Sequence, residues 1–388
     1  MNRVNAEFSI SPRSLPSVAR NAGPSRLDID VVIAVHSTQR PIVRAVASCY
    51  DGLAKQALRV TIVCHNMPSD EIRATVTAAG YDSVRFVELN DGINSPAGPK
   101  NHGMALADAR YVGLLDSDDF YEPGALAHWH TVLTENDADA VVAPVKHLSG
   151  ELIRTPRARI GRTHNLHGVK DRLAYATAPR GLWRTDFLRS IGYQYTEGLR
   201  TGEDLAPGLK LYFSGARTEF PLAGPKYVLG DDAEDRVTAE SLPLKQDFEA
   251  ISRLDQAWLE QLSDSARQSI AIKLARVNLL GAVLRRGSSW PWQEEDLCAL
   301  EDLARQLARL HPNYERPLSI SESQLLAATS QAASNPGAFR SAIESYRAAT
   351  PAERLLTRDI WSTVHPESTA RHLARLLAAG WRPATTGN

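Results

Sequence analysis

The chain has 388 residues, 43% of them hydrophobic and 23% charged, which is the composition of a globular protein long enough for two domains. Its formal net charge of −1 argues against electrostatic binding to nucleic acid or to an anionic membrane surface. No apolar run reaches the roughly 18 residues that a transmembrane segment needs. Three cysteines without metal-type spacing are typical of a reducing compartment, so we expect a cytoplasmic protein.

Residues 1–27 carry four arginines among Ser, Pro and Asn and lack the continuous apolar core of a signal peptide. We predict a mobile N-terminal arm there, with a transit peptide as the alternative. Changes of pattern along the chain then predict two further parts, at 28–242 and 243–388.

Strands and helices alternate from residue 29 onward. Four apolar segments are predicted to be strands, at 29–35, 59–65, 84–89 and 111–115. Helices are predicted between them, at 42–56, 70–79 and 97–108. This alternation is typical of an α/β domain with a mostly parallel sheet, in which ligands bind at the carboxyl ends of the strands. We therefore expect one rim to carry the polar residues that follow these strands: His36-Ser37, His65-Asn66, Asn90-Asp91 and Asp116-Ser117-Asp118.

After about residue 243 the pattern becomes helical, which predicts an all-helical C-terminal domain. One apolar stripe is formed by Ile270, Leu274, Val277 and Leu284, and another by Leu300, Leu303, Leu307 and Leu310. Further helices are predicted near 320–332, 336–348, 351–362 and 366–379. We expect these stripes to form a core, with a homodimer contact as the alternative.

Three carboxylates follow the fourth predicted strand, in the segment YVGLLDSDDF at 111–120. Asp116 and Asp118 can face one polar site, and their mutual repulsion favours protonation unless a cation neutralises it. Mg²⁺ or Mn²⁺ would do so and would also bind substrate phosphates. The alternative is that Asp116 and Ser117 form a turn and that Asp119 caps a helix beginning near Pro123.

The surroundings of these carboxylates resemble the family 2 glycosyltransferases of the GT-A fold. Residues 99–103, PKNHG, stand where the family has a short Ala-Arg-Asn-x-Gly helix, and residues 116–119 stand where it has Asp-x-Asp-Asp. The opening segment DIDVVIAVHSTQRP is similar to the family's first strand and loop. Downstream, APRGLWRTDFLRSIG resembles the acceptor-side segment, which ends in the acidic pair Glu203-Asp204. The resemblance covers residues 29–240.

This resemblance implies an inverting, metal-dependent enzyme that moves a sugar, as a hexosyltransferase does, from a nucleoside diphosphate sugar to an acceptor hydroxyl. UDP is the expected nucleotide. Asp118 would bind the metal, and Asp116 would share the metal or reach the ribose. Asp204 would be the general base and Glu203 would hold an acceptor hydroxyl, whereas taken alone this pair would be interpreted as a helix cap.

The same resemblance assigns donor contacts to residues in several loops. They are His36, Ser37, His65, Asn66, Lys100, Asn101, Asp116, Gly181, Arg236 and Thr238. His65 and Asn66 replace an acidic residue of the family, and both can donate and accept hydrogen bonds. Lys100 replaces an arginine and meets a diphosphate as a point charge. Gly181 is expected to let the backbone approach the donor sugar.

Several signals have two interpretations. Trp183 is either a wall for the sugar or a buried strand residue. Residues 154–167 contain four arginines and two histidines without an acid, and they are either a solvated basic loop or a contact for an anionic acceptor or a phosphate. Asp231 or Asp232 is either a late metal ligand or part of an acidic loop.

Two competing functions can be weighed against the transferase. A sugar-phosphate nucleotidyltransferase would need a glycine-rich loop after the first strand, and VHSTQRP has no glycine. A binding or scaffolding protein that has lost turnover would not need both Asp118 and Asp204. The acceptor stays open between a small molecule, a lipid-linked sugar and a polysaccharide.

Overall fold

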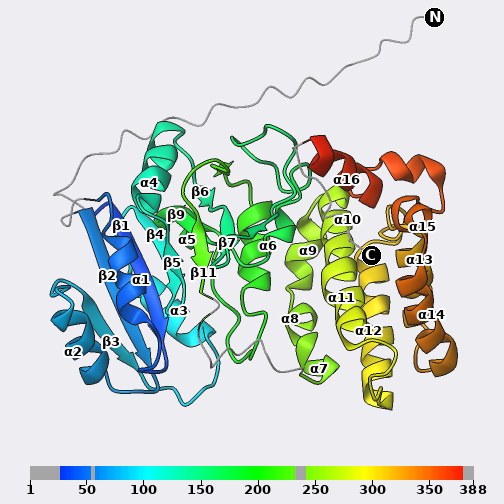
Figure 1. The fold of residues 1–388 in the computed structure, drawn as a ribbon, viewed down its shortest axis with the longest axis horizontal. Helices are drawn as coiled ribbons and strands as arrows, with labels where there is room; N and C mark the ends of the chain where they lie inside the picture. Colours follow the sequence, from blue (N-terminus) through cyan, green and yellow to red (C-terminus); the bar gives the residue numbers. More distant parts are fainter. Residues whose placement is uncertain (1–26, 54–56, 231, 233–241, 379–388) are drawn as a thin grey trace, which may run out of the picture.

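The computed structural model describes residues 27–53, 57–230, 232 and 242–378. Figure 1 shows an α/β part at one end and a helical region at the other, with helix α6 (Leu205–Phe213) between them. The predicted N-terminal arm lies outside the described residues, apart from residue 27. Within the described ranges, no helix combines the length and apolar character needed to cross a membrane.

The α/β part is built on a seven-stranded sheet in the order β10-β6-β9-β4-β1-β2-β3. The strands are β1 (Ile29–Val35), β2 (Leu58–His65), β3 (Arg85–Leu89), β4 (Tyr111–Asp116), β6 (Ala140–Val142), β9 (Gly181–Arg184) and β10 (Thr218–Glu219). β1 pairs in parallel with β2 and β4, and only β9 runs antiparallel to its neighbours. The mostly parallel sheet and all four predicted strands are therefore confirmed.

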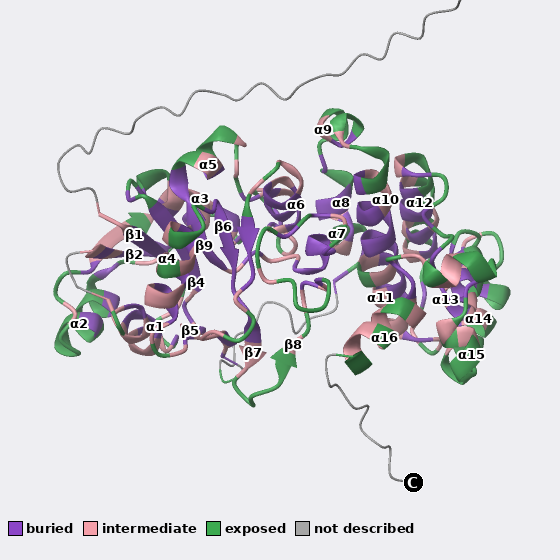
Figure 2. Ribbon diagram, turned by 90° about the horizontal axis from the view of Figure 1, so that it is seen from above, coloured by how far each residue is buried: buried purple, intermediate pink, exposed green. Residues whose placement is uncertain are grey.

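Helices cover both faces of this sheet. They are α1 (Ile42–Cys49), α2 (Asp70–Ala78), α3 (Ala97–Leu106), α4 (Ala125–Glu135), α5 (Thr185–Ser190) and α6. Successive residues of β1 belong to different cores: Ile33 packs with α1 and α4, and Val32 packs on the side of α3. Because side chains alternate along a strand, covering both faces requires continuous apolar runs. Figure 2 shows the central strands coloured as buried.

A second sheet folds back against the end of β4. It contains β5 (Phe120–Tyr121), β11 (Tyr227–Leu229), β7 (Val145–His147) and β8 (Leu152–Ile153), in the order β5-β11-β7-β8. The segment after β11 runs so close to β4 that a Cβ atom on Gly230 would lie 1.9 Å from the carbonyl oxygen of Asp118. The acidic segment at the end of β4 is therefore covered by a segment that lies more than 100 residues further along the sequence.

The predicted all-helical character of the C-terminal region is confirmed. Its elements are α7 (Leu244–Asp247), α8 (Glu249–Ser252), α9 (Gln256–Gln261), α10 (Asp264–Lys273), the π-helical turn η4 (Leu274–Leu280), α11 (Gly281–Arg286), α12 (Glu294–Leu310), α13 (Ile320–Thr329), α14 (Pro336–Ala348), α15 (Pro351–Leu355), the 3-10 turn η5 (Ile360–Val364) and α16 (Thr369–Ala378). Leu205 and Leu209 of α6 share one core with Ile251, Ile270 and Leu274. The domain boundary near residue 243 stays a prediction, because this core spans it.

The apolar stripe predicted for residues 270–284 is wrong at one position. Ile270 and Leu274 are fully buried, but Val277 is 40% exposed. The reason is the π-helical turn η4, whose wider i to i+5 bonding shifts the face that follows it, so that Leu279, Leu280 and Val283 are buried instead. The helix predicted at 351–362 is likewise broken, since α15 ends at Leu355.

Candidate active site at the carboxyl edge of the sheet

Three hollows adjoin one another where the parallel strands end. The rim cleft, of about 400 Å³, is lined by His36, Arg40, His65, Lys100, Asp116, Asp118 and Arg180, among others. The inner pocket, of about 240 Å³, is lined by Lys100, Asp116, Arg180, Tyr195, Glu203 and Asp204, among others. The side cavity, of about 260 Å³, is lined by Val142, Val145, Ile153, Tyr175, Arg180 and Asp204, among others.

Shared residues fix the order of these hollows. Lys100 and Asp116 line both the rim cleft and the inner pocket, whereas Asp204 lines both the inner pocket and the side cavity. Arg180 borders all three. His36, His65, Asp116 and Asp118 therefore line one cleft, as their positions after the strands predicted. Asp204, at the start of α6, lines the adjoining inner pocket together with Asp116.

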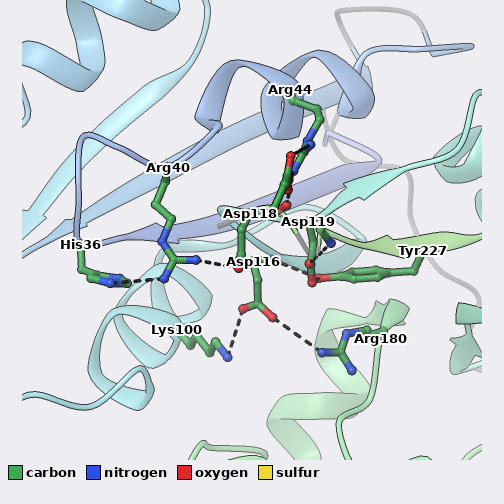
Figure 3. A network of polar contacts seen from close by, with 11 residues as sticks. His36, Arg40, Arg44, Lys100, Asp116, Asp118, Asp119, Arg180 and Tyr227 are labelled. Atoms are coloured by element: carbon green, nitrogen blue, oxygen red, sulfur yellow. Dashed lines mark hydrogen bonds and ion pairs between the residues drawn. The ribbon is translucent and has the colours of Figure 1, made fainter. Parts of the chain in front are cut away.

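The carboxylates of this rim are matched by cations of the protein (Figure 3). Asp118 Oδ2 lies 2.6 Å from Arg40 Nη1, and Asp116 Oδ1 lies 3.3 Å from Lys100 Nζ. Arg180 Nη2 stands 3.9 Å from Asp116 Oδ2. Burial would raise the pKa of Asp116, but the charges of Lys100 and Arg180 outweigh it and hold this pKa below its ordinary value. The repulsion expected from the sequence is thus relieved by Arg and Lys.

Asp119 has a different role from its neighbours, and the helix cap suggested for it is wrong. Helix α4 begins at Ala125 behind Gly124, whereas Asp119 accepts hydrogen bonds of 2.8 Å from the Tyr227 hydroxyl and from the Gly230 backbone N–H. Burial and the charge of Asp116 raise the pKa of Asp119 to about 7. This carboxyl group ties the segment after β11 to the end of β4.

Lys100 connects the rim to the acidic pair before α6. Its Nζ lies 3.1 Å from Glu203 Oε1, as well as near Asp116. Burial lowers the pKa of Lys100, but the charges of Asp116, Glu203 and Asp204 outweigh it and raise the pKa above its ordinary value. For Glu203, burial raises the pKa while Lys100 opposes the rise. Lys100 thus stays charged between carboxylates of both halves of the site.

Asp204 occupies the N-cap position of α6, but its side chain makes no capping hydrogen bond. Its carboxylate therefore does not serve the helix as the capping interpretation required. Instead Asp204 lines both the inner pocket and the side cavity.

The residues predicted after β1 and β2 divide into two kinds. His36 and His65 line the rim cleft, and His65 Nε2 lies 2.9 Å from Asp91 Oδ1. The side chain of Asn66 accepts a hydrogen bond from Gly92 N and donates one to the Ile93 carbonyl, so it orders that loop and does not line the rim cleft. Ser37 accepts a hydrogen bond of 3.2 Å from the Gln39 backbone N–H and likewise does not line the rim cleft.

The structure does not bring Asn101 and Gly181 into the cleft. The Asn101 side chain bonds the backbone of Tyr195 in both directions, at 3.0 and 2.8 Å, and it lines a separate hollow with Met104 and Tyr193. At Gly181, with φ of +140°, a Cβ atom would lie 2.0 Å from the Val141 carbonyl oxygen. Close packing against β6 therefore accounts for this glycine without a donor sugar.

The remaining predicted residues are of two kinds. Some lie outside the described residues, and others are held by contacts with neighbouring side chains. Arg236, Thr238 and Asp231 lie outside the described residues. Asp232 pairs with Arg44, with contacts of 2.6 and 2.9 Å. Trp183 is fully buried and stacks on Tyr193, so the interpretation as a buried strand residue is confirmed.

Sequence reasoning missed Arg40 and Arg180. The Arg40 side chain is only 6% exposed, and Arg180 lies over the Tyr227 ring at 5.1 Å with its Nε buried and without a hydrogen-bond partner in the described chain. Arg40 follows β1 in the irregular segment VHSTQRP, and Arg180 precedes β9 in the irregular segment APRG. In such segments no periodic pattern marks a functional side chain. Their only signal was an arginine beside a strand end.

Two carboxylates are available to a divalent cation at the rim. No group of three or more His, Cys, Asp and Glu side chains suited to a metal occurs within the described residues. Mg²⁺-like ions commonly use one or two carboxylates and take their other ligands from substrate phosphates and water, so Asp116 and Asp118 fit such an ion when a diphosphate is bound. Arg40 would then have to share or release Asp118.

Several known proteins are similar to this chain in sequence. Residues 30–191 match the family model described as glycosyl transferase family 2. The succinoglycan biosynthesis protein ExoU of Rhizobium meliloti (strain 1021) is 29% identical over 206 residues, which cover 49% of this chain and 58% of that protein. The poly(ribitol-phosphate) beta-N-acetylglucosaminyltransferase TarS of Staphylococcus aureus (strain MW2) is 23% identical over 44% of this chain and 29% of its own length. The chain thus spans less than two thirds of the length of either relative.

The fold has close counterparts among solved structures. S. aureus TarS 1–349 in complex with UDP-GlcNAc superimposes with a TM-score of 0.66 at 17% identity, covering 83% of this chain and 92% of that chain. A complex of the same fragment with UDP gives the same TM-score. Coverage of 83% of this chain exceeds the 29–240 segment expected from sequence, so it includes part of the helical region.

Proposed function

Because the α/β part of this chain belongs to glycosyl transferase family 2, we propose that the protein transfers a sugar from a nucleoside diphosphate sugar to an acceptor hydroxyl. UDP is the proposed nucleotide, and the complexes of TarS with UDP and UDP-GlcNAc support that choice. The proposed reaction is a single displacement with inversion at the anomeric carbon.

The observation that carries this proposal is the position of Asp204 between two hollows. The diphosphate is assigned to the rim cleft, the sugar to the inner pocket and the acceptor to the side cavity. Asp204 lines the last two, so its carboxylate can take the proton of an acceptor hydroxyl that attacks the sugar. In this assignment the leaving diphosphate stays in the rim cleft, beside Lys100 and Asp116, which also line the inner pocket. In the proposed reaction the acceptor hydroxyl attacks from the side cavity and the diphosphate leaves toward the rim cleft, and a single displacement of this kind inverts the anomeric carbon.

The cations of the rim supply the charge that the leaving group needs. Lys100 borders the diphosphate side of the inner pocket, and Arg180 borders all three hollows. Charged donors held in a partly buried site stabilise negative charge as it develops on the leaving diphosphate. Lys100 is held in place by Glu203, which favours a positioning role for Glu203 over direct contact with the acceptor.

The remaining donor contacts, to the base, the ribose and the metal, are assigned to residues of the rim cleft. His36 and His65 are assigned to the base and ribose, because both line the rim cleft. Asp118 and Asp116 are the residues that would hold Mg²⁺ or Mn²⁺, which would add positive charge at the diphosphate.

The experiment that tests the function is a thermal-shift screen of nucleoside diphosphate sugars with and without Mn²⁺, followed by measurement of UDP release. A ligand that binds only the folded protein raises its melting temperature. Asp118→Asn is expected to reduce the Mn²⁺-dependent shift with UDP. Asp204→Asn is expected to keep that shift and to slow UDP release by roughly 10²–10⁴-fold, since general-base catalysis has that magnitude.

The matched control is Asp82→Asn, at an exposed position in the turn after α2, which should leave both measurements unchanged. Near-normal UDP release by Asp204→Asn would mean that the base is wrongly assigned. Absence of a thermal shift with every nucleoside diphosphate sugar would favour the scaffolding protein.

A further inference from the structure

Five arginines gather where the basic loop after β8 meets the C-terminal helix α16. This arginine cluster consists of Arg157, Arg172, Arg276, Arg371 and Arg375. Several of its guanidinium groups bind backbone carbonyls: Arg172 bonds Arg157 O at 2.9 Å and also the Pro366 carbonyl, and Arg375 bonds the Ala158 carbonyl. Arg276, in the π-helical turn η4, donates a hydrogen bond to the Glu367 carbonyl. Segments from three regions of the chain thus converge on this cluster.

The positive charge of the cluster exceeds the negative charge beside it. Arg276 pairs with Glu322, with contacts of 2.9 and 3.1 Å. Glu367 is the other carboxylate at the cluster, and it accepts hydrogen bonds from Ser269 Oγ at 3.0 Å and from the Tyr175 hydroxyl at 3.2 Å. Among the described residues, no carboxylate forms an ion pair with the other four arginines of the cluster. The five arginines thus meet two carboxylates, Glu322 and Glu367, and a third, Asp171, which is paired with Arg159.

Neighbouring groups respond to this excess charge. Burial, followed by the charges of Arg157 and Arg375, lowers the pKa of His372 to about 3. Burial, followed by the charges of Arg172 and Arg157, lowers the pKa of Arg375 itself to about 10. In addition, Arg375 Nε is buried and has no hydrogen-bond partner in the described chain. A bound anion would offset this positive charge.

The cluster adjoins the side cavity through one shared residue. Tyr175 lines that cavity together with Asp204, and the Arg157 guanidinium carbon lies 3.9 Å from the centroid of its ring. Arg276 also reaches the Tyr175 hydroxyl, at 3.4 Å. On the other side, Arg371 is exposed on α16, so the cluster reaches solvent at this end, whereas Arg172 is buried.

We propose that the arginine cluster binds a phosphate group carried by the acceptor, next to the hydroxyl that receives the sugar. This inference rests on the proposed function, because it takes the side cavity as the acceptor side. A phosphate fits the site because guanidinium groups bind its oxygens with paired hydrogen bonds and because its charge offsets the excess. The loop at 154–167 then contributes through Arg157, whereas Arg159 is used by an ion pair with Asp171.

The test is a titration of the full-length protein with inorganic phosphate in the presence of saturating UDP, which occupies the rim cleft. Melting temperature is the readout, and potassium chloride at equal ionic strength is the comparison. The double variant Arg371→Gln/Arg375→Gln is expected to weaken the apparent phosphate affinity by at least about tenfold, since charge-assisted hydrogen bonds are lost. Arg340→Gln, at an exposed position of α14, is the matched control and should behave as the unaltered protein.

A second variant keeps the test decisive if the double variant does not fold. Arg371→Gln alone changes only an exposed side chain and is expected to weaken phosphate binding several-fold. A phosphate response that is unchanged in a folded variant, or that chloride reproduces in full, would overturn the proposal. Loss of the UDP response in the unaltered protein would instead refute the proposed function, so the two failures can be told apart.

Discussion

Lys273 gives a quantitative prediction about the helical region. This lysine lies at the end of α10 and is completely buried. Its Nζ donates a hydrogen bond of 3.2 Å to Asn278 Oδ1 within the π-helical turn, and no described carboxylate forms an ion pair with it. Burial lowers its pKa from 10.5 to about 8, and the charge of Asp204 opposes this only in part. We expect Lys273→Met to stabilise the protein at neutral pH.

The magnitude follows from the change in pKa. A shift from 10.5 to about 8 corresponds to about 3 kcal/mol of unfolding free energy at 1.36 kcal/mol per pKa unit. Losing the hydrogen bond to Asn278 offsets about 1 kcal/mol of this gain. Lys273→Met should therefore be more stable than the unaltered protein by about 2 kcal/mol at pH 7.

The pH dependence supplies the stricter test. Between pH 8 and pH 10.5 the unfolded chain binds more protons at Lys273 than the folded chain does, so the stability of the unaltered protein gains from this group as pH rises. The advantage of Lys273→Met should accordingly be full below pH 8 and shrink toward pH 10.

Urea unfolding followed by tryptophan fluorescence, from pH 6.5 to pH 10, measures this difference. Lys245→Met, at an exposed position of α7, is the control and should show no such pH-dependent difference. Parallel stability curves for Lys273→Met and the unaltered protein across this range would refute the reasoning, because the lysine would then not be losing its charge through burial.

Three further substitutions test the site. Gly181→Ala should lose at least about 2 kcal/mol in urea unfolding, because its new methyl group would overlap a backbone carbonyl of β6 at positive φ; retained stability would contradict that packing. Arg40→Gln removes the ion-pair partner of Asp118 and should tighten Mn²⁺ binding measured by calorimetry, whereas weaker binding would argue against Asp118 as a ligand. Tyr227→Phe removes a donor from the buried carboxyl group of Asp119 and should cost about 1–3 kcal/mol in the same unfolding assay, so an unchanged midpoint would count against this contact.

Much of the fold could be predicted because its signals are local. Three of the four predicted strands, β1, β2 and β4, are buried on both faces, and that requirement appears in the sequence as continuous apolar runs. Parallel strands end at one edge, so the polar residues behind them could be expected to meet there. The same reasoning placed His36, His65, Asp116 and Asp118 around one cleft.

The partners of these side chains could not be predicted, because packing between distant segments selects them. Asp119 bonds Tyr227 across 108 positions of sequence, and Asn101 faces Tyr195 across 94. Neither pairing leaves a periodic trace. The π-helical turn η4 moved Val277 to the surface for a related reason, since the apolar pattern assumes a regular helix.

The sequence by itself determined the four strands β1 to β4, the edge at which the acidic residues gather, and the helix start that carries Glu203 and Asp204. Only the tertiary structure decided which charges neutralise one another, with Arg40 on Asp118 and Lys100 between the two halves of the site. The physical reason is that backbone geometry and burial repeat along the chain at short range, whereas charge pairing depends on distances in space. The arginine cluster beside α16 depends on those distances alone.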